Sequence, residues 1–188
     1  IAQRFAREGY VALAPDLYHG QTTKSPDEAG KLMMSLRVDE AARDLAAAIG
    51  YLTALPDVVG PGGRRGPKVG TIGFCMGGAL SLFAASKNRE VGACVVFYGG
   101  HPNIKPDLPA LGAPVLGIYA GKDAFVNPQV VAELDRQLTD LGKPHTFHTY
   151  AEAAHAFFNE ERPEVYDPAA AKDAWAKTLA FLRRELHA

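Results

Sequence analysis

Residues 68–88, KVGTIGFCMGGALSLFAASKN, contain the part of the sequence that decides the fold. The stretch begins with an apolar run of strand length and continues with an apolar run of helix length. Between the two runs lies Cys75, and we expect Gly73 and Gly77 on either side of it to leave room for neighbouring backbone at a sharp turn. A strand-to-helix turn of this kind directs its central side chain outward, so the pattern predicts an α/β fold with Cys75 in a nucleophile's position.

Further apolar runs of strand length divide the rest of the chain. They are continuous rather than alternating, which is typical of parallel strands covered on both faces. With the run that precedes Cys75, the expected strands are residues 10–16, 68–74, 91–99, 113–121 and 145–150.

Segments of helical periodicity lie between the expected strands. Three apolar stripes indicate helices within residues 38–52, 131–141 and 175–186. Asn127 and Asp167 each precede a proline, which is typical of a helix start, and Gly142 is typical of a helix end. Strands that alternate with helices predict a mostly parallel sheet flanked by helices, and residues 60–67, GPGGRRGP, indicate a surface turn.

Composition limits the possible functions. A chain of 188 residues is long enough for one well-packed domain, and we expect a single domain over residues 1–188. The 20 Lys and Arg balance 21 Asp and Glu without a basic run, so we expect neither nucleic acid nor membrane as a partner. The two cysteines do not form a secreted disulfide framework, which favours a cytoplasmic protein.

The first residues, IAQRFAREGYVALAPD, have the pattern of an amphipathic helix that is already under way. We therefore expect the natural chain to begin earlier and the domain to be N-terminally incomplete, with strands of its sheet preceding Ile1. A targeting segment could also precede it.

The motif GFCMG matches the G-x-S-x-G nucleophile elbow with cysteine in the serine position. Taken alone, such a cysteine is often a small core residue. However, Asp123 follows the expected strand at 113–121, and His155 follows the one at 145–150. Carboxyl ends of parallel strands share one edge of a sheet, so the order Cys, Asp, His predicts a catalytic triad at that edge.

These residue types suit nucleophilic attack on a carbonyl group. A thiolate attacks, histidine carries the proton, and a carboxylate holds the histidine in one tautomer. The backbone N–H of Met76 would stabilise the oxyanion, with a second donor expected from a loop that precedes Ile1. No metal-ligand spacing is present, and we expect no metal and no cofactor.

Other cysteine and histidine residues have simpler interpretations. Cys94 lies inside an apolar strand and is expected to be buried, while His145 and His148 are expected to serve packing or the surface. His19 and His101 follow strand ends, where they could contact a substrate or simply be solvated.

The segments GFCMGG, GKDAFV, AHAFF and APDLYHG together resemble the dienelactone hydrolase (carboxymethylenebutenolidase) family, in order and over nearly the whole chain. The resemblance implies an α/β hydrolase that cleaves enol lactones or small esters without a cofactor. It implies Cys75 as nucleophile, His155 as acid and base, and Asp123 as the orienting carboxylate.

Two positions depart from that family's pattern. Where members that act on dienelactone carry arginines for the substrate carboxylate, this chain has Gly20 and Asn159. We therefore expect a carboxylic ester hydrolase that acts on a small neutral or weakly anionic ester or lactone. We also expect the protein to be a monomer or a weak dimer. Aromatic and histidine side chains next to the expected rim are the candidates for substrate contact: Tyr18, His19, Phe125 and Phe157.

Two alternatives stay open from the sequence alone. A Cys elbow also occurs in enzymes of the glutamine-amidotransferase type, but there a histidine commonly follows the cysteine, where this chain has Met76. The other alternative is a catalytically silent α/β-hydrolase scaffold that binds a ligand or senses oxidants through its thiol.

Overall fold

The computed structural model describes residues 1–56, 58 and 69–186. Its internal contacts divide the chain into two compact units, residues 1–67 and residues 68–188, and each is described by itself. The predicted surface turn at residues 60–67 lies outside the described residues, and the single domain stays a prediction.

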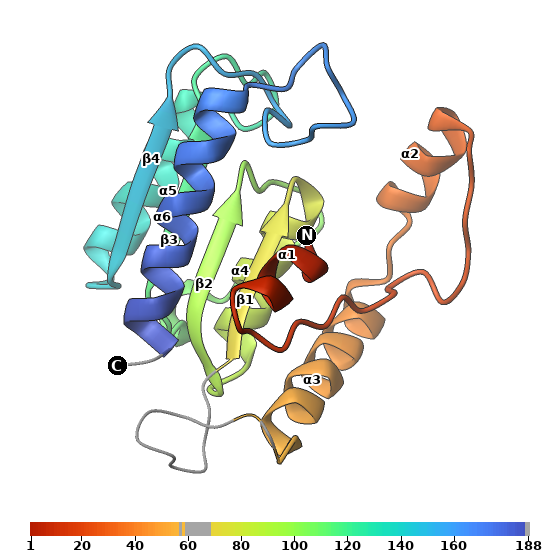
Figure 1. Cartoon of the computed structure of the whole chain (residues 1–188), viewed down its shortest axis with the longest axis vertical. Helices are drawn as coiled ribbons and strands as arrows, with labels where there is room; N and C mark the ends of the chain where they lie inside the picture. Colours follow the sequence, from red (N-terminus) through yellow and green to blue (C-terminus); the bar gives the residue numbers. More distant parts are fainter. Residues whose placement is uncertain (57, 59–68, 187–188) are drawn as a thin grey trace. The chain divides into compact units, whose positions relative to one another are not determined.

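A four-stranded parallel sheet forms the centre of the second unit (Figure 1). Its strands pair in the order in which they follow one another in the sequence. They are β1 (Val69–Phe74), β2 (Val91–Phe97), β3 (Val115–Ala120) and β4 (His145–Tyr150). The prediction of these four strands and of a parallel sheet is therefore confirmed, although β2 and β3 are shorter than the apolar runs that predicted them.

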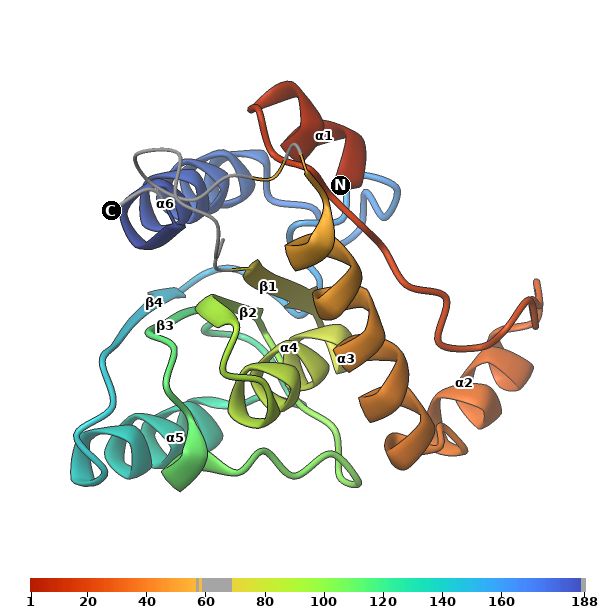
Figure 2. The same ribbon diagram turned by 90° about the horizontal axis from the view of Figure 1, so that it is seen from below.

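Helices cover both faces of this sheet (Figure 2). Two helices, α4 (Met76–Lys87) and α5 (Pro128–Asp140), lie on one face, and α6 (Pro168–Leu186) lies on the other. The oxygen of the Asn127 side chain accepts the N–H groups of Gln129 and Val130, and that of Asp167 accepts the N–H of Ala170. The predicted helix starts at both Asn-Pro and Asp-Pro are thus confirmed, with proline in the first turn. A short 3₁₀ helix, η2 (Leu108–Ala110), precedes β3.

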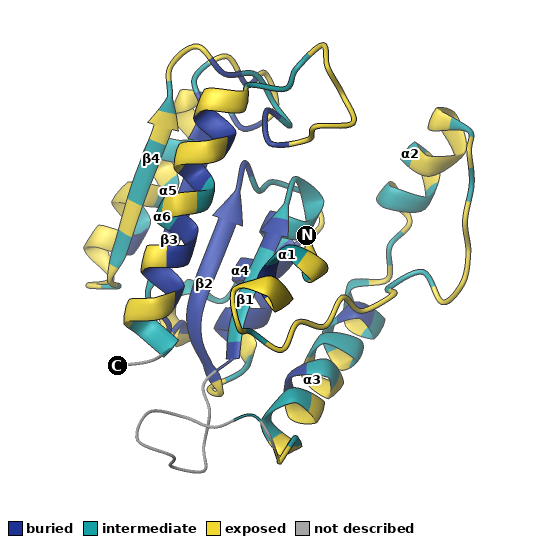
Figure 3. Ribbon diagram, in the orientation of Figure 1, coloured by how far each residue is buried: buried dark blue, intermediate teal, exposed yellow. Residues whose placement is uncertain are grey.

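The core of the second unit lies along the two inner strands (Figure 3). Every residue of β2 and β3 is buried, as their continuous apolar sequences require. In contrast, β1 and β4 are only partly buried. The expectation that all strands are covered on both faces is wrong for these two, because each is at an end of the described sheet.

The first unit contains α1 (Ala2–Arg7), α2 (Pro26–Met34) and α3 (Val38–Ala54). Helix α2 is absent from the sequence-based prediction, although its start has a clear signal: the Ser25 hydroxyl accepts the N–H of Glu28, and Pro26 follows. Among the described residues, no helix combines the length and the hydrophobicity needed to cross a membrane.

The strand predicted at residues 10–16 is wrong. This segment has no regular secondary structure, and residues 11–16 are exposed. A β-strand needs a neighbouring strand to satisfy its backbone hydrogen bonds, and no strand in the described part of the chain pairs with this segment.

Candidate active site

Cys75 lies on a sharp turn between β1 and α4. Its backbone has φ 54° and ψ −123°, and a positive φ is a conformation that residues other than glycine rarely adopt. The turn is held from both sides, because Cys75 N–H donates to the Phe97 carbonyl (3.0 Å) and the Cys75 carbonyl accepts Gly78 N–H (2.9 Å). Such a strained turn at the carboxyl edge of a sheet has the geometry of a nucleophile elbow.

The glycines around this turn differ in their roles. A Cβ atom at Gly73 would lie only 1.8 Å from the Gly77 carbonyl oxygen, so the elbow requires glycine there. At Gly77 a Cβ would meet no atom of the described residues within 4 Å, which corrects the expectation that both glycines make room for backbone. The second close approach is instead between Gly78 and Gly99, where α4 passes the end of β2.

This difference provides a matched pair of substitutions. We expect Gly73→Ala to lower the free energy of unfolding by at least about 1–3 kcal/mol, because a backbone carbonyl must move. Gly77 lies in the first turn of α4, so Gly77→Ala should leave the free energy of unfolding unchanged or raise it by about 0.5–1 kcal/mol. Chemical denaturation of the two variants measures the difference, and equal stability would contradict the elbow's packing.

Asp123 follows β3 and is fixed by its own loop. Its side chain is buried, with 3% of the residue exposed. One carboxylate oxygen accepts the backbone N–H groups of Phe125 (2.8 Å) and Val126 (2.9 Å). The other oxygen lies 2.6 Å from Nδ1 of His155. These bonds together leave the carboxylate with a single orientation.

His155 lies in the loop after β4. Its bond to Asp123 through Nδ1 leaves Nε2 as the nitrogen for a second partner. Two aromatic rings border the imidazole, Tyr98 at 5.0 Å and Phe125 at 5.5 Å between ring centroids. The next residue, Ala156, has φ 65°, a second strained position in the site.

Cys75 and His155 influence each other's protonation. A hydrogen bond with His155 lowers the pKa of the Cys75 thiol, and the same bond raises the pKa of His155 against the effect of its burial. Asp123 raises the pKa of His155 further. These shifts have opposite signs and both favour a thiolate beside an imidazolium.

The backbone at the start of α4 also acts on the thiol. The Met76 backbone hydrogen-bonds the Cys75 sulfur and contributes to its lowered pKa. Met76 is the first residue of α4, where the helix dipole favours negative charge. The same N–H is well placed for an oxyanion that forms next to the sulfur.

The four candidate substrate contacts have different environments. Phe125 is 80% exposed beside His155 and accessible to a ligand, whereas Phe157 is buried against the rings of Tyr98 and Tyr150. Tyr18 and His19 belong to the first unit, where His19 pairs with Asp44 (2.8 Å).

The remaining cysteine and histidine residues singled out in the sequence lie in the strands or in a loop of the second unit. Cys94 is fully buried, and burial raises its pKa to about 11. His145 bonds the Lys143 carbonyl and Asp135, and His148 lies in β4. The Nδ1 atom of His101 accepts the N–H of Asn103 (3.2 Å).

Tyr98 is a residue near the site that the sequence did not single out. It follows β2 directly, and its ring contacts His155. No sequence signal distinguishes it, because Tyr98 lies within the expected strand at 91–99, whereas the observed β2 ends at Phe97.

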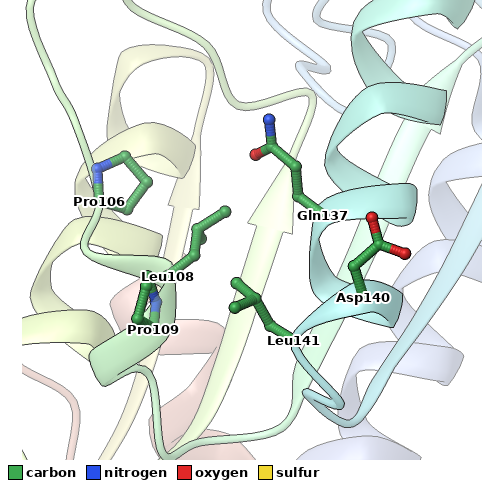
Figure 4. Close-up of a pocket in the computed structure, with 6 residues that line it drawn as sticks. All are labelled: Pro106, Leu108, Pro109, Gln137, Asp140 and Leu141. Atoms are coloured by element: carbon green, nitrogen blue, oxygen red, sulfur yellow. The ribbon is translucent and has the colours of Figure 1, made fainter.

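A hollow of about 330 Å³ lies elsewhere on the second unit, between η2 and α5 (Figure 4). It is lined by Pro106, Leu108, Pro109, Gln137, Asp140 and Leu141. The lining from α5 comes from its carboxyl end, which leads into the start of β4. The hollow is thus at the opposite end of the strands from Cys75, and its lining contains no nucleophile or histidine.

A parallel sheet covered by helices, with an elbow after β1 and Asp and His loops after β3 and β4, defines an α/β hydrolase. Residues 1–186 match the dienelactone hydrolase family, and the chain belongs to that family. It is 38% identical to Protein usf of Aquifex pyrophilus, over 99% of this chain and 80% of that protein.

Solved structures agree with this assignment. The crystal structure of a putative dienelactone hydrolase from Klebsiella pneumoniae has a TM-score of 0.82 and 28% identity, covering 97% of this chain and 78% of that one. The crystal structure of a dienelactone hydrolase from Anabaena variabilis has a TM-score of 0.62 and 25% identity, covering 88% and 70%. The sequence-based resemblance and the fold class are therefore confirmed.

Proposed function

We propose that this protein is a carboxylic ester hydrolase that cleaves a small ester or lactone through Cys75, His155 and Asp123. The observation that carries the proposal is the 2.6 Å pair between His155 Nδ1 and the buried Asp123 carboxylate, beside an elbow cysteine whose thiol pKa is lowered by His155. Membership of the dienelactone hydrolase family supports the same reaction class.

In the first half of the proposed reaction, the Cys75 thiolate attacks the carbonyl carbon, and the oxygen takes the negative charge beside the Met76 N–H. Collapse of this intermediate breaks the ester bond. The leaving alkoxide takes the proton from Nε2 of His155, which leaves an acyl thioester on Cys75 and a neutral imidazole.

In the second half, water attacks the thioester and gives a proton to Nε2 of His155. Collapse now expels the Cys75 thiolate and releases the carboxylic acid, so the thiolate and imidazolium are regenerated. Asp123 accepts Nδ1–H throughout and stabilises the positive ring at both steps.

The direct test is turnover of a small activated ester, before and after the protein is treated with iodoacetamide. We expect hydrolysis that disappears in proportion to the alkylation of Cys75. Alkylation without any hydrolysis by the untreated protein, over a panel of esters and lactones, would overturn the proposal and favour a thiol that senses oxidants or a binding scaffold.

The charges near the site also support a preference for uncharged substrates. Lys122, next to Asp123, pairs with Glu152 (2.5 Å), and Arg162 pairs with Glu164 (2.8 Å). Where family members that act on dienelactone carry a carboxylate-binding arginine, this chain has Asn159, a neutral amide whose oxygen accepts the Glu161 N–H. No side chain among these offers an uncompensated positive charge to a substrate carboxylate.

We therefore expect a neutral ester to be a better substrate than the same ester with a free carboxylate, by about tenfold or more in kcat/KM. A missing charge-assisted hydrogen bond accounts for a difference of this size. The measurement compares a matched pair of esters, one with a free carboxylate and one with that carboxylate masked. A preference for the free acid that disappears in Lys122→Ala or Arg162→Ala would contradict the prediction.

A further inference from the structure

Tyr98 occupies an unusual place in the second unit. It follows the last residue of β2 with φ 37°, a left-handed conformation that tyrosine rarely adopts. Its side chain is nevertheless ordered by burial, with 2% of the residue exposed. Its backbone N–H donates to the Ile118 carbonyl of β3 (2.7 Å), which holds the strained turn in place.

The ring of Tyr98 connects the sheet to the histidine loop. It lies 5.0 Å from the His155 ring and 5.6 Å from Phe157, both in the loop after β4. Its hydroxyl hydrogen-bonds the main chain of Phe158 in the same loop. One side chain therefore contacts three of the four residues 155–158.

We propose that Tyr98 is a positioning residue that holds the His155 imidazole in the orientation at which Nε2 reaches the Cys75 sulfur. This inference rests on the proposed function, because it concerns the proton carrier of that reaction. Asp123 fixes one edge of the imidazole through Nδ1, but a single hydrogen bond leaves the ring free to rotate about it. The Tyr98 ring supplies the second restraint, against the imidazole itself.

The chemistry of the Tyr98 side chain also suits its position next to the Cys75 thiolate and the His155 imidazolium. The ionisable groups that act on His155 are Cys75 and Asp123, with the Tyr98 phenol beside them. Burial and the nearby Cys75 charge raise the pKa of the phenol, so it stays neutral while the imidazole changes charge. The electron-rich ring favours the imidazolium form, as an aromatic ring does for other cations.

Three variants test this role. Tyr98→Leu removes the ring, Tyr98→Phe keeps the ring and removes only the hydroxyl, and Tyr150→Leu is the matched control. Tyr150 packs on Phe157 (5.2 Å) as Tyr98 does, but its hydroxyl bonds Asp173 on α6 (2.7 Å) rather than the histidine loop. Each variant is measured for ester turnover and for the rate of Cys75 alkylation as a function of pH.

In Tyr98→Leu we expect kcat to fall on the order of 10²-fold with KM little changed, as for other losses of orientation. The alkylation profile should also move to higher pH, because a displaced imidazolium no longer lowers the pKa of the thiol. Tyr98→Phe should restore the wild-type profile and most of kcat, and Tyr150→Leu should leave the profile unchanged.

A wild-type alkylation profile in Tyr98→Leu would overturn the proposal, as would an equal shift in Tyr150→Leu. If Tyr98→Leu does not fold, Tyr98→Phe is compared with His155→Ala, which lacks the imidazole altogether. An alkylation profile that shifts as far in Tyr98→Phe as in His155→Ala would overturn the proposal, because the aromatic ring is still present and would not be what restrains the imidazole. Alkylation needs no ester substrate, so these outcomes stand apart from a failure of the proposed hydrolysis.

Discussion

Replacement of Cys75 by alanine is expected to abolish ester hydrolysis, with a loss in kcat on the order of 10⁶-fold, as in other enzymes that lose a covalent nucleophile. The alanine has no atom that can form the acyl intermediate, and His155 loses the partner of its Nε2. The fold should survive, because the turn depends on glycine at position 73 and on backbone hydrogen bonds rather than on the thiol. Steady-state kinetics and thermal unfolding of the variant measure both effects.

Cys94→Ala is the matched control for this substitution. Cys94 is a fully buried residue of β2 whose sulfur lies 3.5 Å from the Ser81 hydroxyl, so its loss should cost some stability and leave kcat unchanged. Hydrolysis that survives in Cys75→Ala and disappears in Cys94→Ala would show that the elbow is not the reaction centre.

The fold of the second unit could be predicted from the sequence because its signals are local. Four apolar runs correspond to β1 to β4, and the Asn-Pro and Asp-Pro starts with their apolar stripes correspond to α5 and α6. The run at residues 10–16 is as apolar as these, yet it is not a strand. Pairing depends on a neighbour elsewhere in the chain, which the composition of a single segment does not reveal.

The same limit applies to the candidate site. Cys75, Asp123 and His155 can be proposed from sequence because each lies in the turn or loop after an expected strand, and parallel strands end at one edge. The same argument selects Phe157, but this residue turns inward and is buried. Phe157 and the adjacent Phe158 are both buried, on a stretch of loop whose backbone Ala156 bends with φ 65°, and the path of that loop cannot be read from the sequence.

Backbone strain is concentrated at this edge of the sheet. Cys75, Tyr98 and Ala156 are the three non-glycine residues of the second unit's described part that have positive φ. Each such conformation costs on the order of 1–3 kcal/mol and persists only when the surroundings enforce it. Here the close approach of Gly78 to Gly99 and the bond of Tyr98 N–H to Ile118 provide that enforcement. The core thus stabilises an arrangement that brings thiol and imidazole together.

Asp123→Asn is expected to lower kcat on the order of 10⁴-fold, as loss of the same charge does in serine proteases with this arrangement. The asparagine oxygen can still accept the N–H groups of Phe125 and Val126, so the loop keeps its shape. Its amide then directs N–H donors at Nδ1 of His155, which must become an acceptor. The ring proton moves to Nε2, and the imidazole can no longer take a proton from water there. Steady-state and single-turnover kinetics of the variant measure the loss.

The control is Asp167→Asn, which makes the same chemical change at a carboxylate that also accepts a backbone N–H, that of Ala170 (2.9 Å). Asparagine serves there as a helix cap, so both stability and kcat should stay close to wild type. Burst kinetics separate the two halves of the reaction: the acyl thioester should accumulate in Asp123→Asn, because its hydrolysis needs the base most directly. A variant with wild-type kcat, or one whose loss is matched by Asp167→Asn, would show that Asp123 stabilises its own loop and does not orient His155 for proton transfer.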